Sequence, residues 1–264
     1  MTLNFPGLHL TPLLCAILLV SCAAPEAPAR IQMFAASSMT DAITELRDRF
    51  QEETGYQVEL TLSSSSSLAV QIQSGGEADL FLPANLEWAD AAATNKRGGS
   101  RLLEQIELVS NRLVVVARSD SKQRLTSLLD LAAESVGEIA IAEPSSVPAG
   151  IYAREALERA ELWQVLHERL IPGSNVRTAL GYVETGGVPI GIVYASDAAA
   201  SPNVRVLFEI DPQSHSPIQY PLMLLRHSER VEGAAEFYAY LTSLDAARVF
   251  RRHGFTPRLT PVSG

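Results

Sequence analysis

Short apolar runs alternate with segments of helical spacing along most of this 264-residue chain, and this alternation constrains its fold more than any other feature. Residues 31–35 form an apolar run that predicts a strand. Residues 38–53 predict a helix that ends at Gly55, with a buried face made of Ala42, Ile43, Leu46 and Phe50. Strands that alternate with helices predict parallel sheets covered on both faces, so the expected fold class is α/β.

The alternation divides into two groups, with a split near Asn111 and a return near Ile218. The further predicted strands are 58–62, 78–82, 113–117, 138–142, 188–194 and 204–208. The further predicted helices are 68–73, 125–133, 151–160, 162–170, 176–183, 233–241 and 244–253. The last two helices have no sheet of their own and are expected to return to the first group. We therefore predict two lobes joined by two crossing strands, with a cleft between them: lobe one over 31–111 plus 216–264, and lobe two over 112–215.

The N-terminus predicts export. An apolar run there is too short to span a bilayer as a helix, and it ends in the sequence LVSC at 19–22, which resembles the lipobox of bacterial lipoproteins. We predict a signal peptide over 1–21, lipid on Cys22, and a Pro/Ala-rich tether over 22–30. The mature protein would then lie in the periplasm or at the cell surface, held to a membrane through Cys22. The alternative is an ordinary secretory signal cut near Ala23.

Charge and cysteine content exclude several classes of function. The net charge of −9 leaves no broad basic field for nucleic acid. It also attracts no anion at long range, so an anionic ligand would have to be bound by local dipoles. The only cysteines are Cys15 and Cys22, so the mature chain would have no disulfide and no thiolate metal site. The histidines show no metal-ligand spacing, and no metal bound by protein side chains is expected.

Small or hydroxyl residues stand where several predicted helices begin. The junctions are 35–38, 63–67, 147–150 and 174–176. The N-terminus of a helix has free N–H groups and a partial positive charge, so it binds anions without a cationic side chain. In α/β folds such junctions lie at the carboxyl ends of parallel strands, where ligands bind. Hydroxyl and N–H donors that converge on one cleft suit a compact, fully deprotonated anion.

Several of these segments together resemble the molybdate-binding proteins that serve bacterial ABC importers. The resemblance covers nearly all of 31–255 and rests on six segments: FAASSMT at 34–40, the serine run before Leu68, ADLF at 78–81, VPAGIYA at 147–153, VRTAL at 176–180 and GIVYASD at 191–197. It implies a two-lobed periplasmic binding protein of type II that captures molybdate, and tungstate as its near-isostere. It also implies a monomer with no cofactor and no catalysis, which delivers the anion to a membrane permease with a cytoplasmic ATPase.

The resemblance places the oxyanion contacts at five positions of this sequence. Ser38 and Ser65 would each offer a hydroxyl and a backbone N–H. Ala149 and Val176 would each offer a backbone N–H, and Tyr194 would offer its phenol O–H. The two serines belong to the predicted lobe one and the other three residues to lobe two, so a bound anion would bridge the lobes.

Other readings of the same residues stay open. Within the serine run, Ser64 or Ser66 is an alternative to Ser65. Locally, Ser38 with Asp41 has the Ser-x-x-acid form of a capping box, and Arg177 is expected to pair locally rather than to join the site. Sulfate has the charge and shape of molybdate and is the alternative ligand. A serine hydrolase is disfavoured, because the chain lacks a Gly-x-Ser-x-Gly elbow and a histidine placed to activate a serine.

Overall fold

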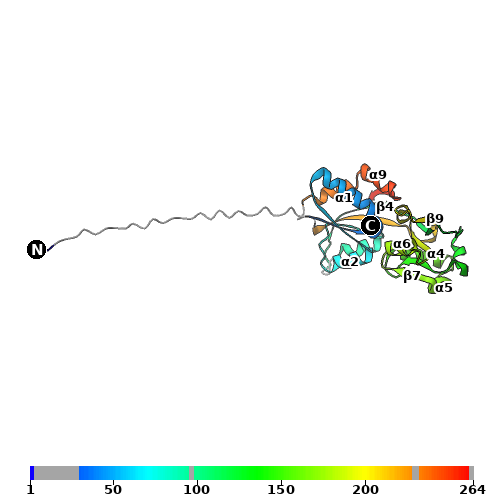
Figure 1. Ribbon diagram of the computed structural model, residues 1–264. Coiled ribbons are helices and arrows are strands. Elements are labelled where there is room, and N and C mark those ends of the chain that lie inside the picture. Colours follow the sequence, from blue (N-terminus) through cyan, green and yellow to red (C-terminus); the bar gives the residue numbers. More distant parts are fainter. Residues whose placement is uncertain (3–29, 95–97, 228–231, 262–264) are drawn as a thin grey trace.

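The protein consists of two α/β lobes, each built on one sheet, in a computed structural model that describes residues 1–2, 30–94, 98–227 and 232–261 (Figure 1). The first sheet has the strand order β11-β4-β10-β3-β1-β2. Its strands are β1 (Ile31–Ala36), β2 (Val58–Ser63), β3 (Leu80–Leu82), β4 (Leu102–Ser110), β10 (Gln219–Leu225) and β11 (Thr256–Pro261). Its helices are the 3₁₀ turn η1 (Ser37–Met39), α1 (Thr40–Thr54), α2 (Ser65–Gln73), α3 (Leu86–Ala93), α8 (Ala234–Leu241) and α9 (Leu244–Arg252).

The second sheet has the order β7-β6-β8-β5-β9. Its strands are β5 (Leu113–Arg118), β6 (Ile139–Ala142), β7 (Leu170–Gly173), β8 (Ile190–Tyr194) and β9 (Val204–Glu209). Its helices are α4 (Pro148–Arg159), α5 (Trp163–Leu166), α6 (Val176–Glu184) and α7 (Ala195–Ala199). The 3₁₀ turns are η2 (Leu128–Ala132), η3 (Glu134–Val136), η4 (His167–Arg169) and η5 (Pro212–Ser214). The helix predicted over 125–133 forms only the short 3₁₀ turn η2, and the helix predicted over 162–170 is replaced after Leu166 by η4 and β7.

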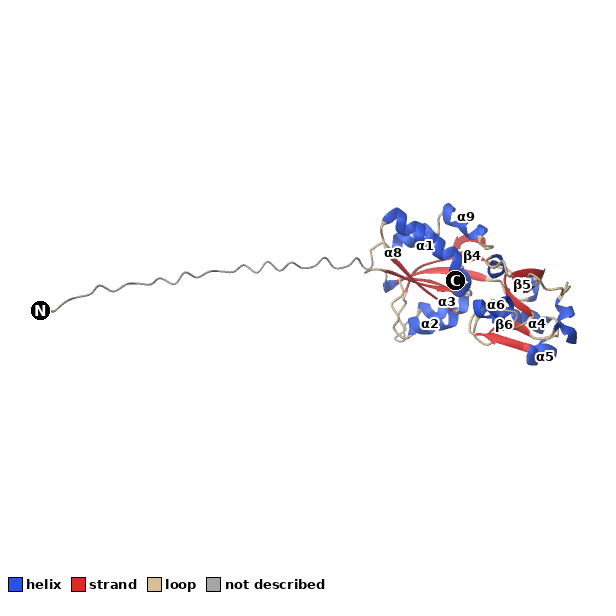
Figure 2. Cartoon of the chain, in the orientation of Figure 1, coloured by secondary structure: helices blue, strands red, loops and turns tan. Residues whose placement is uncertain are grey.

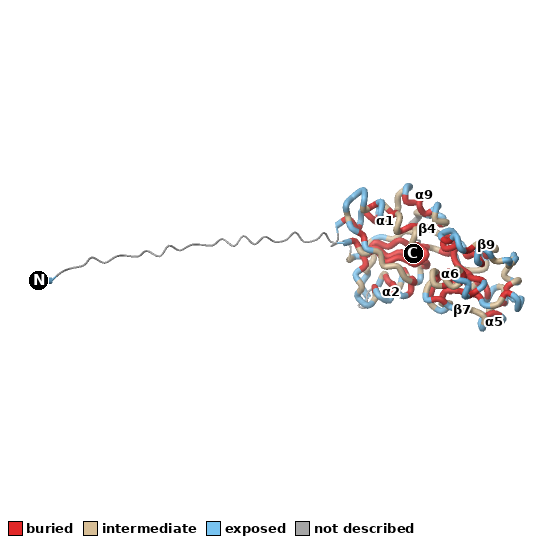
Figure 3. The backbone as a smooth tube through the Cα atoms, viewed as in Figure 1, coloured by how far each residue is buried: buried red, intermediate tan, exposed pale blue. Residues whose placement is uncertain are grey.

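Helices cover the first sheet on both faces, with α1, α8 and α9 on one side and α2 and α3 on the other (Figure 2). The period of a strand sends Phe34 toward α2 and α3, and Met33 and Ala35 to the opposite face. The predicted apolar face of α1 is buried, and Gly55 ends that helix with a positive φ of 81°. Figure 3 shows the buried backbone running through the sheets of both lobes.

Both sheets are mixed, which corrects the prediction of parallel sheets. β1 pairs in parallel with β2 and β3, whereas β10 runs antiparallel to β3 and β4. In the second lobe β5 runs antiparallel to β8 and β9. The physical reason is the double crossing: the chain leaves lobe one along β4 and returns along its neighbour β10, so the two strands must run in opposite directions.

The chain crosses between the sheets twice, at 111–112 and at 210–218. Ser110 at the end of β4 pairs with Gln219 at the start of β10, so the two crossings lie side by side. We propose lobe limits of 31–111 with 216–264 and of 112–215 on either side of these crossings. Residues 3–29, which include most of the predicted signal peptide, Cys22 and most of the tether, lie outside the described residues.

Candidate functional site

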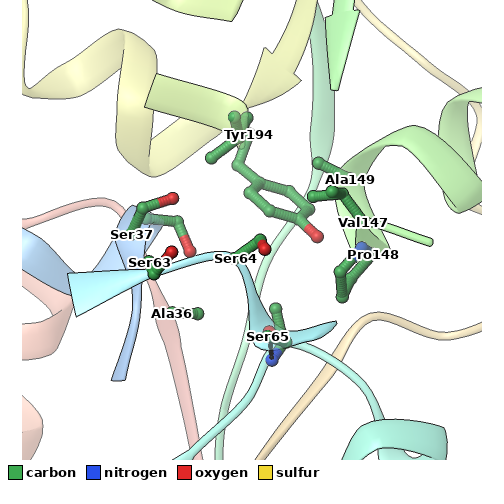
Figure 4. A pocket seen from close by; sticks show the side chains of 12 residues that line it. Ala36, Ser37, Ser63, Ser64, Ser65, Val147, Pro148, Ala149 and Tyr194 are labelled. Atoms are coloured by element: carbon green, nitrogen blue, oxygen red, sulfur yellow. Dashed lines mark hydrogen bonds between the residues drawn. The ribbon is translucent and has the colours of Figure 1, made fainter. Parts of the chain in front are cut away.

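All five residues predicted to contact a ligand line one pocket between the two lobes (Figure 4). The pocket encloses about 200 Å³, which includes its opening to solvent. Residues from β1 and α2 face residues from α4, α6 and β8 across it. Its lining consists of Ala36, Ser37, Ser38, Ser63, Ser64, Ser65, Ala84, Val147, Pro148, Ala149, Val176 and Tyr194.

Ser38 lies in the turn that connects β1 to α1, and its side chain is buried. Its Oγ lies 2.9 Å from the Oη of Tyr220, and either atom can donate. The predicted capping box is wrong, because Met39 is the N-cap of α1 and no side chain caps it. The turn η1 displaces Ser38 from the capping position, and Thr40 stabilises this turn by donating its hydroxyl to the Ser37 carbonyl at 2.6 Å.

The serine run is the N-terminus of a helix rather than a linker. Ser64 is the N-cap of α2, and its Oγ accepts a hydrogen bond from the Ser67 N–H at 3.3 Å. Ser65 is therefore the first residue of the helix, and its side chain is buried. The backbone N–H of Ala84 donates to the Ser65 Oγ at 2.9 Å, which holds this hydroxyl in place. Ser64 also lines the pocket, whereas Ser66 does not.

Two helix N-termini form the wall from lobe two. Helix α4 begins at Pro148 and α6 begins at Val176, so the amides of Ala149 and Val176 lie in first turns, where the helix supplies no carbonyl partner. The N-cap of α6 is Asn175, whose side chain accepts from the Thr178 N–H at 3.0 Å. These first turns contribute positive partial charge to the pocket without a cationic side chain.

Close packing holds the start of α4 against the sheet. A Cβ atom at Gly150 would lie 2.3 Å from the carbonyl oxygen of Ala142 at the end of β6. Only glycine permits this approach, because any larger residue would push the helix away from the strand. Gly150 therefore positions the neighbouring Ala149 amide at the pocket.

Tyr194 ends β8, and its ring reaches from lobe two toward the serines and the start of α4 (Figure 4). Its Oη is buried and has no hydrogen-bond partner among the described residues. The nearby Tyr220 hydroxyl is engaged by Ser38 and Asn111 instead. Burial raises the pKa of the Tyr194 phenol well above its usual value, so the group stays protonated and remains a hydrogen-bond donor.

Arg177 does not line the pocket but joins the two lobes beside it. Its Nε donates to Asp197 at 2.6 Å, and its Nη2 donates to Asp41 in α1 at 2.5 Å. Arg177 thus stays outside the pocket lining, as predicted, but neither partner is local in the sequence, since Asp197 lies in α7 and Asp41 in the other lobe. Asp197 is fully buried, and burial raises the pKa of its carboxyl to about 6, although the Arg177 charge opposes this rise. The Tyr194 N–H donates to the same carboxylate at 3.3 Å.

The pocket is therefore lined by several hydrogen-bond donors, which are hydroxyls and first-turn amides, and by no charged side chain. None of its lining residues is an Asp, Glu, Lys, Arg or His. Within the described ranges, no three His, Cys, Asp or Glu side chains gather closely enough to hold a metal ion. No helix in those ranges has both the length and the hydropathy of a membrane span. Such a pocket suits a small anion that brings all of the acceptors itself.

A small pocket between two α/β lobes, lined by hydroxyls and helix N-termini, is suited to bind a small solute. The chain belongs to the family of bacterial extracellular solute-binding proteins, whose family model it matches over residues 31–256. Members of this family work outside the cytoplasm, which agrees with the predicted export.

Several proteins that are similar to this chain over most of its length are named for the solute they bind. The molybdate-binding protein ModA of Escherichia coli strain K12 is 39% identical over 236 residues, which cover 86% of this chain and 89% of that protein. The molybdate-binding protein ModA of Haemophilus influenzae strain KW20/Rd is 33% identical over 236 residues, 88% of this chain and 92% of that protein. The solved structure of the periplasmic molybdate-binding protein of Azotobacter vinelandii superposes with a TM-score of 0.76 at 19% identity and covers 86% and 99% of the two chains. This likeness confirms the predicted two-lobed α/β fold.

Proposed function

We propose that this protein binds molybdate, and tungstate as its near-isostere, and delivers the anion to a bacterial ABC importer. One observation carries the proposal: donors from both lobes converge on a single pocket at Ser38, Ser65, Ala149, Val176 and Tyr194. The relatives in Escherichia coli and Haemophilus influenzae, which are named for molybdate, support the identity of the ligand.

The chemistry of the pocket favours a dianion without protons. Serine and tyrosine hydroxyls and first-turn amides all donate to the ligand, and hydrogen bonds to a charged acceptor contribute roughly 1.5–3 kcal/mol each. Phosphate carries a proton at neutral pH, and that proton needs an acceptor. Because no carboxylate or imidazole lines the pocket, phosphate would leave a buried donor facing another donor.

Sulfate remains the alternative ligand, because it shares the charge and the tetrahedral shape of molybdate. Its bonds to oxygen are shorter, so it reaches less far between the two walls. A pocket whose donors come from opposite lobes therefore distinguishes anions by the length of their bonds to oxygen. Sulfate is therefore expected to contact one wall well and the other poorly.

A thermal-shift panel of oxyanions on the mature domain tests the ligand. A ligand that binds only the folded protein adds about 4 kcal/mol at a thousandfold excess over Kd, which corresponds to a melting shift of about ten degrees for a protein of this size. Molybdate and tungstate should produce this shift, and sulfate and phosphate should produce little at equal ionic strength. An equal shift from sulfate would assign the protein to the alternative ligand.

Small-angle scattering tests whether the anion closes the lobes. The two walls are joined by only two crossings, so the free protein is expected to open and the bound protein to close. The radius of gyration of the mature domain should therefore fall when molybdate is added to saturation. An unchanged radius would contradict closure while leaving binding itself intact.

We propose that lipid on Cys22 anchors the protein to a membrane, because the sequence LVSC at 19–22 resembles a lipobox. A single acyl chain binds membranes only marginally, so stable anchoring needs the several chains of a mature lipoprotein. Cys22→Ala should abolish labelling with fatty acid and release the protein from membranes, with Cys15→Ala as the matched control. Continued labelling of Cys22→Ala would show that the anchor lies elsewhere.

We also propose that the protein works as a monomer, without a cofactor and without catalysis. The serines that line the pocket have no base beside them, since no histidine or carboxylate belongs to the lining. A panel of ester substrates should therefore show no turnover. The delivery step is tested with the importer in vesicles, where the molybdate-loaded protein should stimulate ATP hydrolysis.

A further inference from the structure

A chain of buried polar groups leads from Ser38 away from the pocket. Tyr220 is fully buried on β10, and its Oη lies 2.9 Å from the Ser38 Oγ. The Nδ2 of Asn111, at the first crossing between the lobes, donates to the same Tyr220 Oη at 3.4 Å. Neither Tyr220 nor Asn111 lines the pocket, so their influence on a ligand must pass through Ser38.

The orientation of the Asn111 amide determines the direction of this chain. Its Oδ1 accepts a hydrogen bond from the Arg112 N–H at 2.9 Å, so the oxygen faces the backbone. Its Nδ2 then faces the interior, where it also donates to the Ser196 Oγ at 2.8 Å. An amide nitrogen cannot accept, and Tyr220 must therefore be the acceptor in its bond with Asn111.

The remaining hydrogens follow from this direction. Burial raises the pKa of the Tyr220 phenol far above its usual value, so it retains its single hydrogen. Because the Tyr220 Oη accepts from Asn111, that hydrogen is free to be donated to the Ser38 Oγ. Ser38 then accepts from Tyr220, and its own hydrogen is left to point into the pocket.

We propose that Tyr220 and Asn111 are positioning residues that hold the Ser38 hydroxyl as a donor and thereby select against anions that carry a proton. The proposal rests on the proposed function of the same pocket. Ser65 supports it independently, because its Oγ accepts from the Ala84 N–H and is likewise left with a hydrogen to donate. Both serines thus receive a hydrogen bond from the scaffold on the side away from the ligand.

Tyr220→Phe removes the donor to Ser38 and is the main test. The freed Ser38 oxygen can then accept the proton of hydrogen phosphate. Molybdate should bind about three- to tenfold more weakly, and the preference for molybdate over phosphate should fall by about tenfold. Tyr238→Phe is the matched control, because Tyr238 is a buried tyrosine of lobe one that does not line the pocket and whose Oη has no partner among the described residues. It should leave both affinities unchanged.

Asn111→Leu tests the direction of the chain and serves if Tyr220→Phe does not fold. Without the amide donor, either the Tyr220 or the Ser38 hydroxyl can donate in the bond between them. The preference for molybdate over phosphate should therefore fall in this variant too. In the double variant the second change should add little, because both residues act through one hydrogen bond to Ser38. Calorimetry with molybdate and phosphate measures the preference, and circular dichroism verifies the fold.

The outcomes separate this proposal from the function on which it rests. If the wild-type protein does not bind molybdate, both the proposed function and this proposal are wrong. If the wild type binds molybdate and folded Tyr220→Phe keeps the same preference over phosphate, only the positioning role is overturned. Strictly additive effects of the two substitutions would also overturn it.

Discussion

The two walls of the pocket are built from different chemistry. Lobe one contributes side-chain hydroxyls, and those of Ser38 and Ser65 already have hydrogen-bond partners in the scaffold. Lobe two contributes the first-turn amides of α4 and α6, together with a tyrosine hydroxyl that has no partner among the described residues. One wall is thus held in place before a ligand arrives, whereas the other keeps an unpaired donor.

This difference determines which of the five proposed contact positions require a particular side chain. In the proposed binding mode a hydroxyl is required at 38 and 65, because the side chain itself would donate to the anion. At Ala149 and Val176 the proposed donor is the backbone, so the side chain would matter only for packing and the N–H must be present. Tyr194 differs from both, since its side chain is the proposed donor but its hydroxyl has no hydrogen-bond partner among the described residues of the free protein. Three substitutions test these distinctions, and a fourth tests the ion pair that joins the two lobes.

Ser65→Ala should have the largest effect, because it harms both binding and stability. The ligand loses a hydroxyl donor, worth roughly 1.5–3 kcal/mol, which is about a ten- to hundredfold loss of molybdate affinity. The buried Ala84 N–H also loses its acceptor, which should lower the free energy of unfolding by about 1–3 kcal/mol. Calorimetry and urea unfolding measure the two effects. Ser67→Ala, an exposed serine of the same run outside the pocket lining, should change affinity by less than about twofold.

Tyr194→Phe should separate binding from stability. The ligand loses the phenol donor, so molybdate affinity should fall by about tenfold or more. The free protein loses only a buried hydroxyl without a partner, so its unfolding free energy should stay constant or rise by about 1 kcal/mol. A clear loss of stability in the free protein would show that this hydroxyl is satisfied before the ligand binds.

Val176→Pro should weaken binding through the backbone alone. Proline is favoured at the first position of a helix and removes only the N–H. The preceding Asn175 has an extended conformation, with φ of −158° and ψ of 174°, which a following proline tolerates. Molybdate affinity should fall by about tenfold, as for the loss of one donor to a charged acceptor. Val176→Ala keeps the N–H and should change affinity by less than about twofold, so equal losses in the two variants would implicate the side chain instead.

Asp41→Asn should have the smallest effect, because it acts on closure rather than on the ligand. The substitution weakens the bond from Arg177 that joins the lobes, while Asp197 still neutralises the arginine. Partly exposed ion pairs contribute about 0.2–1 kcal/mol, so molybdate affinity should fall by about two- to threefold. Asp48→Asn, in the same helix and paired within it to Arg47, is the control and should bind as the wild type does. A loss larger than that of Val176→Pro would make this ion pair part of the binding machinery.

Local patterns predicted much of the fold but missed several elements. The spacing of Ala42, Ile43, Leu46 and Phe50 predicts α1 with its buried face, because helical period and burial agree there. The strand β11 has no such pattern, since its sequence is TPRLTP, and it is a strand because it pairs with β4 at the edge of the sheet. The short β7 contains Pro172 and was likewise not predicted, because its register with β6 rather than its composition makes it a strand.

The five proposed contacts were predicted from the resemblance to a family. The residues that support these contacts could not be predicted from the sequence. Tyr220 lies 182 positions from Ser38 in the sequence, and Arg177 lies 136 from Asp41. No local spacing relates such residues, because each belongs to an element with its own period. Tyr220 meets Ser38 only after the second crossing returns the chain to the first sheet as β10, and Arg177 meets Asp41 only where the two lobes lie against each other.

The sequence by itself determined the starts of most helices to within a few residues, the apolar face of α1, and the hydroxyls and small residues at the starts of α2, α4 and α6. These properties depend on neighbours within one or two turns, which the order of residues specifies directly. Only the tertiary structure decided that the sheets are mixed, that Arg177 joins the lobes, and that Tyr220 stands behind Ser38. The physical reason is that a hydrogen bond depends on distance and angle in space, and for residues far apart in the sequence these are settled by the order of strands within a sheet and by how the two lobes pack.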